Sequence, residues 1–339
     1  RIAWTNPYRS EREHVVRVRR HPPGQSRIYA RSSIDASAPR VELATDARGY
    51  LLPPPANAAA PVTVVFLGGS TTECTALDPD RRFPVLVESD LRARGLDVAT
   101  RNGAVSGNNV HDTLHVLLDH VVLDAPDLVV VMHATNDTGV LATPLGYLPS
   151  MGEPLDAGVA ALWAKQLASR SSFLFALVRD RLAGVAFAAR PLAADVAARE
   201  HGARAHAIPS APFEQRLRAL VGVARGFAIE PVLMTQPLAT TRTALTPGWA
   251  DAGAQARFND AIRRVARETR TRLVDLDAAV RASGPDWDAP MHLFYDGMHV
   301  TSEGARLYAR AIADALAPAV AERLSRRDLP SSAPAPAGP

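Results

Sequence analysis

The chain has 339 residues, of which 47% are hydrophobic and 22% are charged, so its composition is that of a globular protein and excludes disorder along its whole length. No uninterrupted apolar run approaches the ~20 residues that a membrane-spanning helix needs, and 38 basic against 35 acidic residues leave a formal net charge of only +3. The single cysteine, Cys74, excludes an internal disulfide framework and a cysteine-based zinc site.

Residues 1–60 are predicted to form an arginine- and proline-rich N-terminal extension with short strands at 15–18 and 41–43. A solvated arm is the commoner meaning of its arginine cluster, and a contact with an anionic surface is the alternative. No aromatic platform or known nucleic-acid module accompanies the cluster, so no nucleic-acid partner is expected. Because the chain opens without an initiator methionine, we expect a removed segment upstream of Arg1, such as a signal or a membrane tether. The cluster consists of Arg9, Arg12, Arg17, Arg19 and Arg20.

Strand and helix signals alternate from residue 61 onward, which favours a parallel sheet with helices on both faces. Apolar, β-branched runs predict buried strands at 62–67, 98–101, 128–133, 231–235 and 273–276. Amphipathic patterns predict helices at 83–96, 109–123 and 302–324, and one that carries Phe258, Ile262 and Val265. The helix at 109–123 is expected to bury one face made of Val110, Leu114, Leu117, Leu118 and Val121.

The interval at about 140–228 is rich in alanine and helical by propensity. It is either a helical insertion that roofs a pocket or a set of ordinary covering helices, and the sequence favours neither. Residues 327–339 contain mostly Pro, Ala and Ser and are predicted to be a disordered tail. The main domain is therefore expected at 61–326.

Four polar clusters follow predicted strands or precede the last helix, at residues 68–73, 102–108, 133–137 and 296–299. In parallel α/β sheets, ligands bind outside the carboxyl ends of the strands. We therefore expect the clusters to meet at one edge of the sheet.

Together the clusters hold the groups that an acyl-transfer site needs. Ser70 lies between a strand and a helix, where its hydroxyl would face the crevice as a nucleophile. His299 is the candidate base, and Asp296 would hold its imidazole in the right tautomer. The N–H groups of Ser70 and Gly107 and the side-chain amide of Asn136 would form an oxyanion hole. Each residue also has an ordinary role alone, as a cap, a turn residue or a satisfied histidine, but their joint placement favours the site.

Neighbouring polar residues are assigned smaller roles. Glu73 suits the first turn of a helix through the helix dipole. Cys74 is predicted to be a small buried side chain, and His292 to lie at the surface or at a pocket rim. His111 and His115 are four residues apart, but no carboxylate accompanies them, so no metal site is expected.

The four clusters, in this order and spacing, resemble the sequence blocks of the SGNH (GDSL-type) hydrolase superfamily over about residues 60–310. The resemblance implies a flavodoxin-like three-layer α/β/α fold with a five-stranded parallel sheet, and ester hydrolysis or acyl transfer without metal or organic cofactor. By position, Ser70 matches the nucleophile, Gly107 and Asn136 match the oxyanion glycine and asparagine, and Asp296 with His299 matches the D-x-x-H pair.

Two positions depart from the family pattern. Gly69 stands where the first block usually has aspartate, and Ala134 stands where the third block usually has glycine. The methyl group of Ala134 is expected to crowd the acyl pocket or to shift Asn136. The Gly-Gly-Ser-Thr-Thr block at 68–72 resembles that of bacterial envelope-associated members, which implies an O-acetylated glycan as substrate and a periplasmic or extracellular location.

The sequence therefore predicts a serine esterase that forms an acyl-enzyme on Ser70. One alternative is a polysaccharide O-acetyltransferase that uses the same residues. A second, from another class, is a catalytically idle domain that binds glycan as a scaffold.

Overall fold

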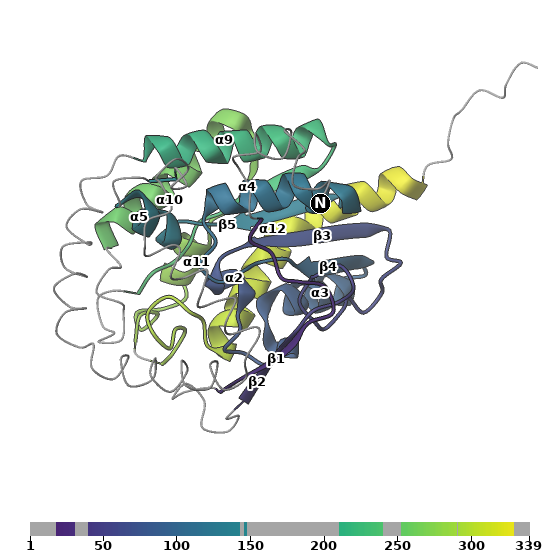
Figure 1. The fold of residues 1–339 in the computed structure, drawn as a ribbon, viewed down its shortest axis with the longest axis horizontal. Helices are drawn as coiled ribbons and strands as arrows, with labels where there is room; N and C mark the ends of the chain where they lie inside the picture. Colours follow the sequence, from purple (N-terminus) through teal and green to yellow (C-terminus); the bar gives the residue numbers. More distant parts are fainter. Residues whose placement is uncertain are drawn as a thin grey trace, which may run out of the picture.

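A central parallel sheet forms the middle layer of the protein. The computed structural model describes residues 18–30, 40–142, 146–147, 210–239, 252–289 and 291–328. Its five-stranded sheet has the order β4-β3-β5-β6-β7, with every neighbouring pair parallel (Figure 1). Because the second strand of the sheet along the chain lies outside the first, the order is flavodoxin-like. The strands are β3 (Val62–Gly68), β4 (Val98–Asn102), β5 (Leu128–Met132), β6 (Glu230–Met234) and β7 (Arg272–Val274).

Both faces of the sheet are buried at its centre, which explains why β3 and β5 are nearly continuous apolar runs. In β3, Val64 and Phe66 contribute to one hydrophobic cluster, while Val65 and Leu67 contribute to the other. Side chains alternate in the same way along β5 and β6. The predicted α/β class, with a five-stranded parallel sheet between helices, is confirmed.

Helices cover the two faces as separate layers (Figure 1). On one face the ring of Phe83 packs against Phe66 and Tyr308, with centroids 5.8 and 5.7 Å apart. The helices of that layer are α3 (Phe83–Ala93), α11 (Leu276–Arg281) and α12 (Ser302–Asp328). The opposite layer contains α4 (Val110–Asp119), α9 (Ala211–Gly226) and α10 (Ala252–Thr269). No helix in the described part of the chain is both long and apolar enough to cross a bilayer.

One predicted strand and one predicted helix need correction. The last strand ends at Val274 rather than at 276, because Asp275 caps α11 by accepting a hydrogen bond from the N–H of Ala278. Leu118 is 41% exposed, so it does not belong to the buried face of α4. After Asp119 the chain turns into a short 3₁₀ helix, η3 (Val121–Asp124), instead of continuing as one helix.

The N-terminal extension packs against the edge strand β4. Its strand β2 (Arg40–Ala44), predicted from 41–43, pairs antiparallel with β1 (Ser26–Ala30), which was not predicted. The N–H of Leu51 then donates to the carbonyl of Asn102 at 2.9 Å. Of the predicted strand at 15–18, only Val18 is described, and it is not in a strand.

The interval at 140–228 is described only in part. Its described portion includes the whole of α9, which packs on the sheet with α4 and α10 as a covering helix. Residues 148–209 of the interval lie outside the described residues. The tail predicted at 327–339 was started two residues too early, because Arg327 and Asp328 still belong to α12, and residues 329–339 lie outside the described residues.

Candidate active site

The carboxyl edge of the sheet brings together Ser70, His299 and Asp296, which are far apart in the sequence. Ser70 opens the short helix α2 (Ser70–Glu73) directly after β3. Its hydroxyl lies 2.8 Å from Nε2 of His299, and Nδ1 of the same imidazole lies 2.6 Å from Oδ2 of Asp296. A hydroxyl, an imidazole and a carboxylate are thus connected in one hydrogen-bonded chain.

The turn at 296–299 holds the imidazole in place. Oδ1 of Asp296 accepts hydrogen bonds from the N–H groups of Met298 at 3.1 Å and His299 at 2.8 Å. The carbonyl of Gly297 accepts a further hydrogen bond from the N–H of Ala239, in the segment after β6. The ring of Tyr295 is stacked on the imidazole of His299, with centroids 5.6 Å apart.

These contacts also decide which imidazole nitrogen carries the proton. Burial alone would raise the pKa of Asp296, but the hydrogen bonds from His299 and Met298 hold the pKa below its ordinary value. An ionised Asp296 only accepts, so the proton of a neutral His299 lies on Nδ1. Nε2 is then free to accept the proton of the Ser70 hydroxyl.

Ser70 does not cap the helix that it begins. Gly69 occupies the N-cap position of α2, and no side chain caps this end of the helix. The hydroxyl of Ser70 is instead directed at His299. The ordinary capping role considered for Ser70 is therefore wrong.

The two other oxyanion candidates lie on neighbouring segments. Gly107 has φ +80°, a left-handed conformation that favours glycine. Nδ2 of Asn136, in α5 (Thr135–Leu141), donates to the carbonyl of Asn108 at 2.8 Å. Within the described residues, neither the Ser70 nor the Gly107 N–H donates a hydrogen bond, so both are free to bind an oxyanion.

The surroundings of Gly69 explain why a glycine stands where the first block of the SGNH superfamily usually has aspartate. A Cβ at this position would overlap Nδ2 of Asn136 and lie 3.1 Å from the carbonyl oxygen of Asn108. The absent side chain therefore lets the Asn136 amide approach the backbone beside Ser70.

Ala134, the second departure from the family pattern, lies in the core, and its expected effect on Asn136 stays a prediction. Its side chain is fully buried in the hydrophobic cluster that joins the sheet to α4, α9 and α10. Its φ of −175° is extended backbone, which any residue adopts. The extra methyl group is accommodated by the core.

Glu73 lies in the first turn of α2, as the sequence predicts, and its carboxylate also makes specific contacts. Its carboxylate is buried, and Oε1 lies 2.7 Å from Nε2 of His21 in the N-terminal extension. Oε2 accepts hydrogen bonds from the N–H of Ser106, at 3.1 Å, and from the Ser106 hydroxyl. The carboxylate thus connects α2, the extension and the loop that carries Gly107.

Gln236 is a buried residue of the site that sequence reasoning missed. It follows β6, so its position at a strand end was the available signal. Its Nε2 donates to the hydroxyl of Thr71 at 3.1 Å, and its Oε1 accepts from the N–H of Thr135 at 3.0 Å. Gln236 therefore connects the neighbours of Ser70 and Asn136.

The remaining candidates have structural surroundings. Cys74 is buried as predicted, and burial raises the pKa of its thiol to about 12. Nε2 atoms of His111 and His115 lie 3.4 Å apart, but the described residues contain no group of three or more metal-ligating side chains. His292 is partly exposed, and its Nδ1 lies 3.5 Å from the carboxylate of Glu303.

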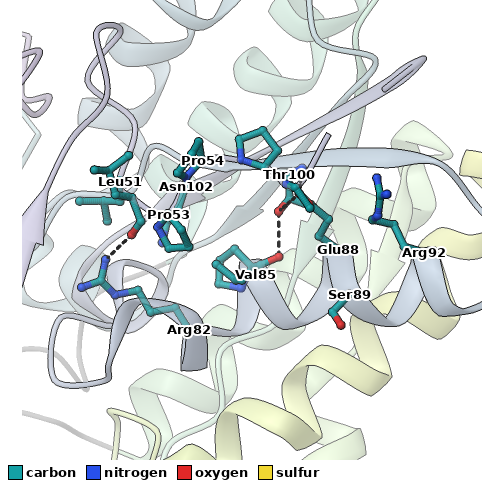
Figure 2. Close-up of a pocket in the computed structure, with 14 residues that line it drawn as sticks. Leu51, Pro53, Pro54, Arg82, Val85, Glu88, Ser89, Arg92, Thr100 and Asn102 are labelled. Carbon is teal, nitrogen blue, oxygen red and sulfur yellow. Dashed lines mark hydrogen bonds between the residues drawn. The ribbon is translucent and has the colours of Figure 1, made fainter. Parts of the chain in front are cut away.

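A cavity of about 370 Å³ lies elsewhere, between residues 51–56 of the extension and α3 (Figure 2). Glu88 lines it and accepts hydrogen bonds from the N–H groups of Ala56 at 2.5 Å and Thr100 at 2.6 Å. Neither Ser70 nor His299 lines this cavity. It belongs to the junction of the extension with the core.

The chain is similar to several known proteins. A family model described as the GDSL-like Lipase/Acylhydrolase family matches residues 66–307. A lipase/acylhydrolase from Enterococcus faecalis is a similar solved structure, with 19% identity, a TM-score of 0.49, and coverage of 76% of this chain and 96% of its own. An acetylxylan esterase from Geobacillus stearothermophilus has 19% identity, a TM-score of 0.46, and coverage of 75% and 94%. A search of curated proteins found no match.

Proposed function

This chain belongs to the GDSL-like lipase/acylhydrolase family, and we propose that it is a serine-dependent hydrolase of acyl esters, with O-acetylated carbohydrate as its substrate. The observation that carries the proposal is the 2.8 Å distance between Oγ of Ser70 and Nε2 of His299, whose other nitrogen contacts Asp296. A serine hydroxyl becomes nucleophilic only when a base at this distance takes its proton.

In the first step, Oγ of Ser70 attacks the ester carbonyl while its proton passes to Nε2 of His299. The carbonyl π electrons move to oxygen, and a tetrahedral oxyanion forms. Collapse of this intermediate breaks the bond to the alkoxy oxygen, which takes the proton from His299 and leaves as the alcohol. The product is an ester of Ser70 with the acyl group.

In the second step, water replaces the alcohol. His299 takes a proton from the water as its oxygen attacks the acyl-enzyme, and a second oxyanion forms. The Ser70 oxygen then leaves with the proton from His299, which releases the carboxylic acid and restores the enzyme. Asp296 remains ionised and stabilises the imidazolium in both steps.

The oxyanion would be bound by the N–H groups of Ser70 and Gly107 and the amide of Asn136. These donors act on the charge that develops only in the transition state, and the loss of one typically costs about 3–4 kcal/mol. The close approach of Asn136 to the backbone at Gly69 supports this assignment.

Transfer to a sugar hydroxyl is the second candidate function. The Gly-Gly-Ser-Thr-Thr block at 68–72, which resembles that of envelope-associated members, favours a carbohydrate partner for the acyl-enzyme. Product analysis with an acetyl donor, with and without an added glycan, distinguishes the two: acetate alone indicates hydrolysis, and an O-acetylated glycan indicates transfer.

The proposal predicts that Ser70→Ala lowers kcat on p-nitrophenyl acetate at least a hundredfold, because it removes the hydroxyl that lies 2.8 Å from Nε2 of His299. Thermal unfolding and steady-state kinetics of the same preparations are the measurements. Ser325→Ala, which changes an exposed serine near the end of α12, is the matched control.

Activity of Ser70→Ala within a few-fold of the wild type would exclude the mechanism. Labelling of the wild type with a fluorophosphonate provides a second check, since the reagent is expected to modify Ser70. A folded protein that neither reacts with it nor hydrolyses esters would instead support the idle glycan-binding scaffold.

A further inference from the structure

We propose that Arg19 and His21 of the N-terminal extension, together with Glu73, form a loop brace, a positioning element that fixes residues 106–108 and so aims the Gly107 N–H at the oxyanion. The inference rests on the proposed function, because it assigns the brace to the oxyanion hole of the same site. Arg19 and His21 lie outside the part of the chain that the family model matches.

The first part of the brace is the buried carboxylate of Glu73. It lies three residues after Ser70, and its two oxygens face different segments. One is 2.7 Å from Nε2 of His21, and the other accepts both the N–H and the hydroxyl of Ser106. Glu73 therefore couples the loop to the turn that carries the proposed nucleophile.

The second part is the guanidinium of Arg19, which lies over the same loop. It donates to the carbonyl of Ser106 at 3.3 Å and to the carbonyl of Gly107 at 3.1 Å. It also reaches the carboxylate of Asp112, in the first turn of α4, at 3.3 Å. One side chain thus joins the loop to the start of the next helix.

The backbone of the extension completes the arrangement. The carbonyl of Arg19 accepts a hydrogen bond from Nδ2 of Asn108 at 2.9 Å, while the carbonyl of Asn108 accepts the 2.8 Å bond from Asn136. A Cβ at Gly107 would come within 3.0 Å of the Arg19 guanidinium, so the two are in close contact. Each residue of the loop is therefore held by Arg19 or Glu73.

The placement of the loop affects catalysis because the Gly107 N–H can stabilise the oxyanion only from the right position. Peptide planarity makes the Gly107 N–H turn with the Ser106 carbonyl, which is one of the groups that Arg19 binds. A misplacement of about 1 Å in an active site can cost around a hundredfold in rate. Loss of the brace should therefore lower kcat while leaving substrate binding largely intact.

The test compares Arg19→Ala and Glu73→Gln with Arg48→Ala, a control that removes an arginine of the same extension whose ion pair is with Asp124. We expect kcat on p-nitrophenyl acetate to fall about tenfold or more in both brace variants, with KM within about twofold of wild type. Arg19→Lys, which keeps the charge but not the fork of donors, should recover only part of the loss.

Hydrogen–deuterium exchange supplies a readout that does not depend on activity. The peptide covering 103–109 should exchange faster in both brace variants than in the control. Glu73→Gln replaces the carboxylate that accepts the Ser106 N–H, and Arg19→Ala removes the guanidinium that holds the carbonyls of Ser106 and Gly107. Arg19 is at the surface, so its variant keeps the test valid even where Glu73→Gln fails to fold.

If Arg19→Ala and Glu73→Gln had the same kcat as the Arg48→Ala control, the proposal of a loop brace would be wrong, whatever the change in melting temperature. A wild-type protein that hydrolyses no ester would refute the proposed function. The hydrogen–deuterium exchange of the 103–109 peptide would then be the only test of the loop brace. Unchanged exchange at 103–109 would overturn the brace, and faster exchange would support it as the element that positions this loop.

Discussion

At the scale of single residues, Gly69 shows how a missing side chain shapes the candidate site. The Asn136 amide occupies the space that a Cβ at this position would take. The amide is also held by the carbonyl of Asn108. An aspartate at position 69, as in the usual first block of the resembling superfamily, would need a different placement of this amide.

We therefore expect Gly69→Asp to lower kcat about tenfold or more, because Asn136 must move away from the oxyanion. Steady-state kinetics with p-nitrophenyl acetate measure the effect. Gly222→Ala is the control, since a Cβ at that helical position meets no atom within 4 Å. If Gly69→Asp turned over substrate like this control, Asn136 would not be an oxyanion donor.

At the scale of secondary-structure elements, Asp137 ties α5 to the start of α4. Its buried carboxylate accepts from the N–H of Val110 at 3.0 Å and from the hydroxyl of Tyr147 at 2.5 Å. Nδ1 of His133 lies 3.8 Å away, but burial lowers the pKa of that imidazole to about 3, so it is neutral. Burial raises the pKa of Asp137 to about 7.

This shift predicts how stability depends on pH. Because its pKa is higher in the folded than in the unfolded protein, Asp137 binds its proton more tightly when folded. Its contribution to stability is complete below the unfolded pKa near 4 and is lost as pH rises toward 7. The free energy of unfolding should fall by up to about 1.4 kcal/mol per pH unit in this window from this one group.

Asp137→Asn removes this titration, so only the wild type should lose stability as pH rises. The free energy of unfolding of the variant minus that of the wild type should therefore increase from pH 4 to pH 7. Urea unfolding at several pH values measures it. A difference that stays constant across the window would mean that Asp137 is ionised throughout.

The elements also show what can be predicted from sequence. The central strands β3 and β5 were found because both of their faces are buried, which leaves apolar runs in the sequence. The last strand was drawn too long because Leu276 continues the apolar run, although Asp275 already caps a helix there. Strand β1 is not a buried apolar run, and its residue Ile28 is 67% exposed, so the sequence carries no comparable signal for this strand.

The same limit applies to the candidate site. Ser70, His299 and their neighbours were proposed from strand ends and spacing, which are local features of the chain. The partners of Glu73 and Gln236 were not foreseen, because each joins segments that only the tertiary fold brings together. His21 lies 52 residues before Glu73, and Gln236 lies 165 residues after Thr71.

At the scale of the whole molecule, buried polar contacts join the extension to the α/β core. The guanidinium of Arg82, at the start of α3, is almost fully buried and donates to the carbonyls of Glu42 and Leu52. The hydroxyl of Tyr50 donates to Asp124 at 2.6 Å. The predicted domain boundary near residue 60 thus separates segments that share many interactions.

Glu88 makes this connection testable. Glu88→Ala would leave the N–H groups of Ala56 and Thr100 without their acceptor, which should lower the free energy of unfolding by about 2–4 kcal/mol. Urea denaturation measures the change. Glu322→Ala, which removes an exposed ion pair with Arg326, should change it by less than about 1 kcal/mol, and equal losses in the two variants would contradict the prediction.

The state of Cys74 has a practical consequence. Its thiol is protonated at neutral pH, is buried in a hydrophobic cluster at the end of α2 and donates to the carbonyl of Thr71 at 3.2 Å. Maleimide dyes and thiol-reactive spin labels should therefore not react with Cys74 in the native protein. Since the chain has no other cysteine, a reporter placed at an engineered surface position would give a signal almost free of background.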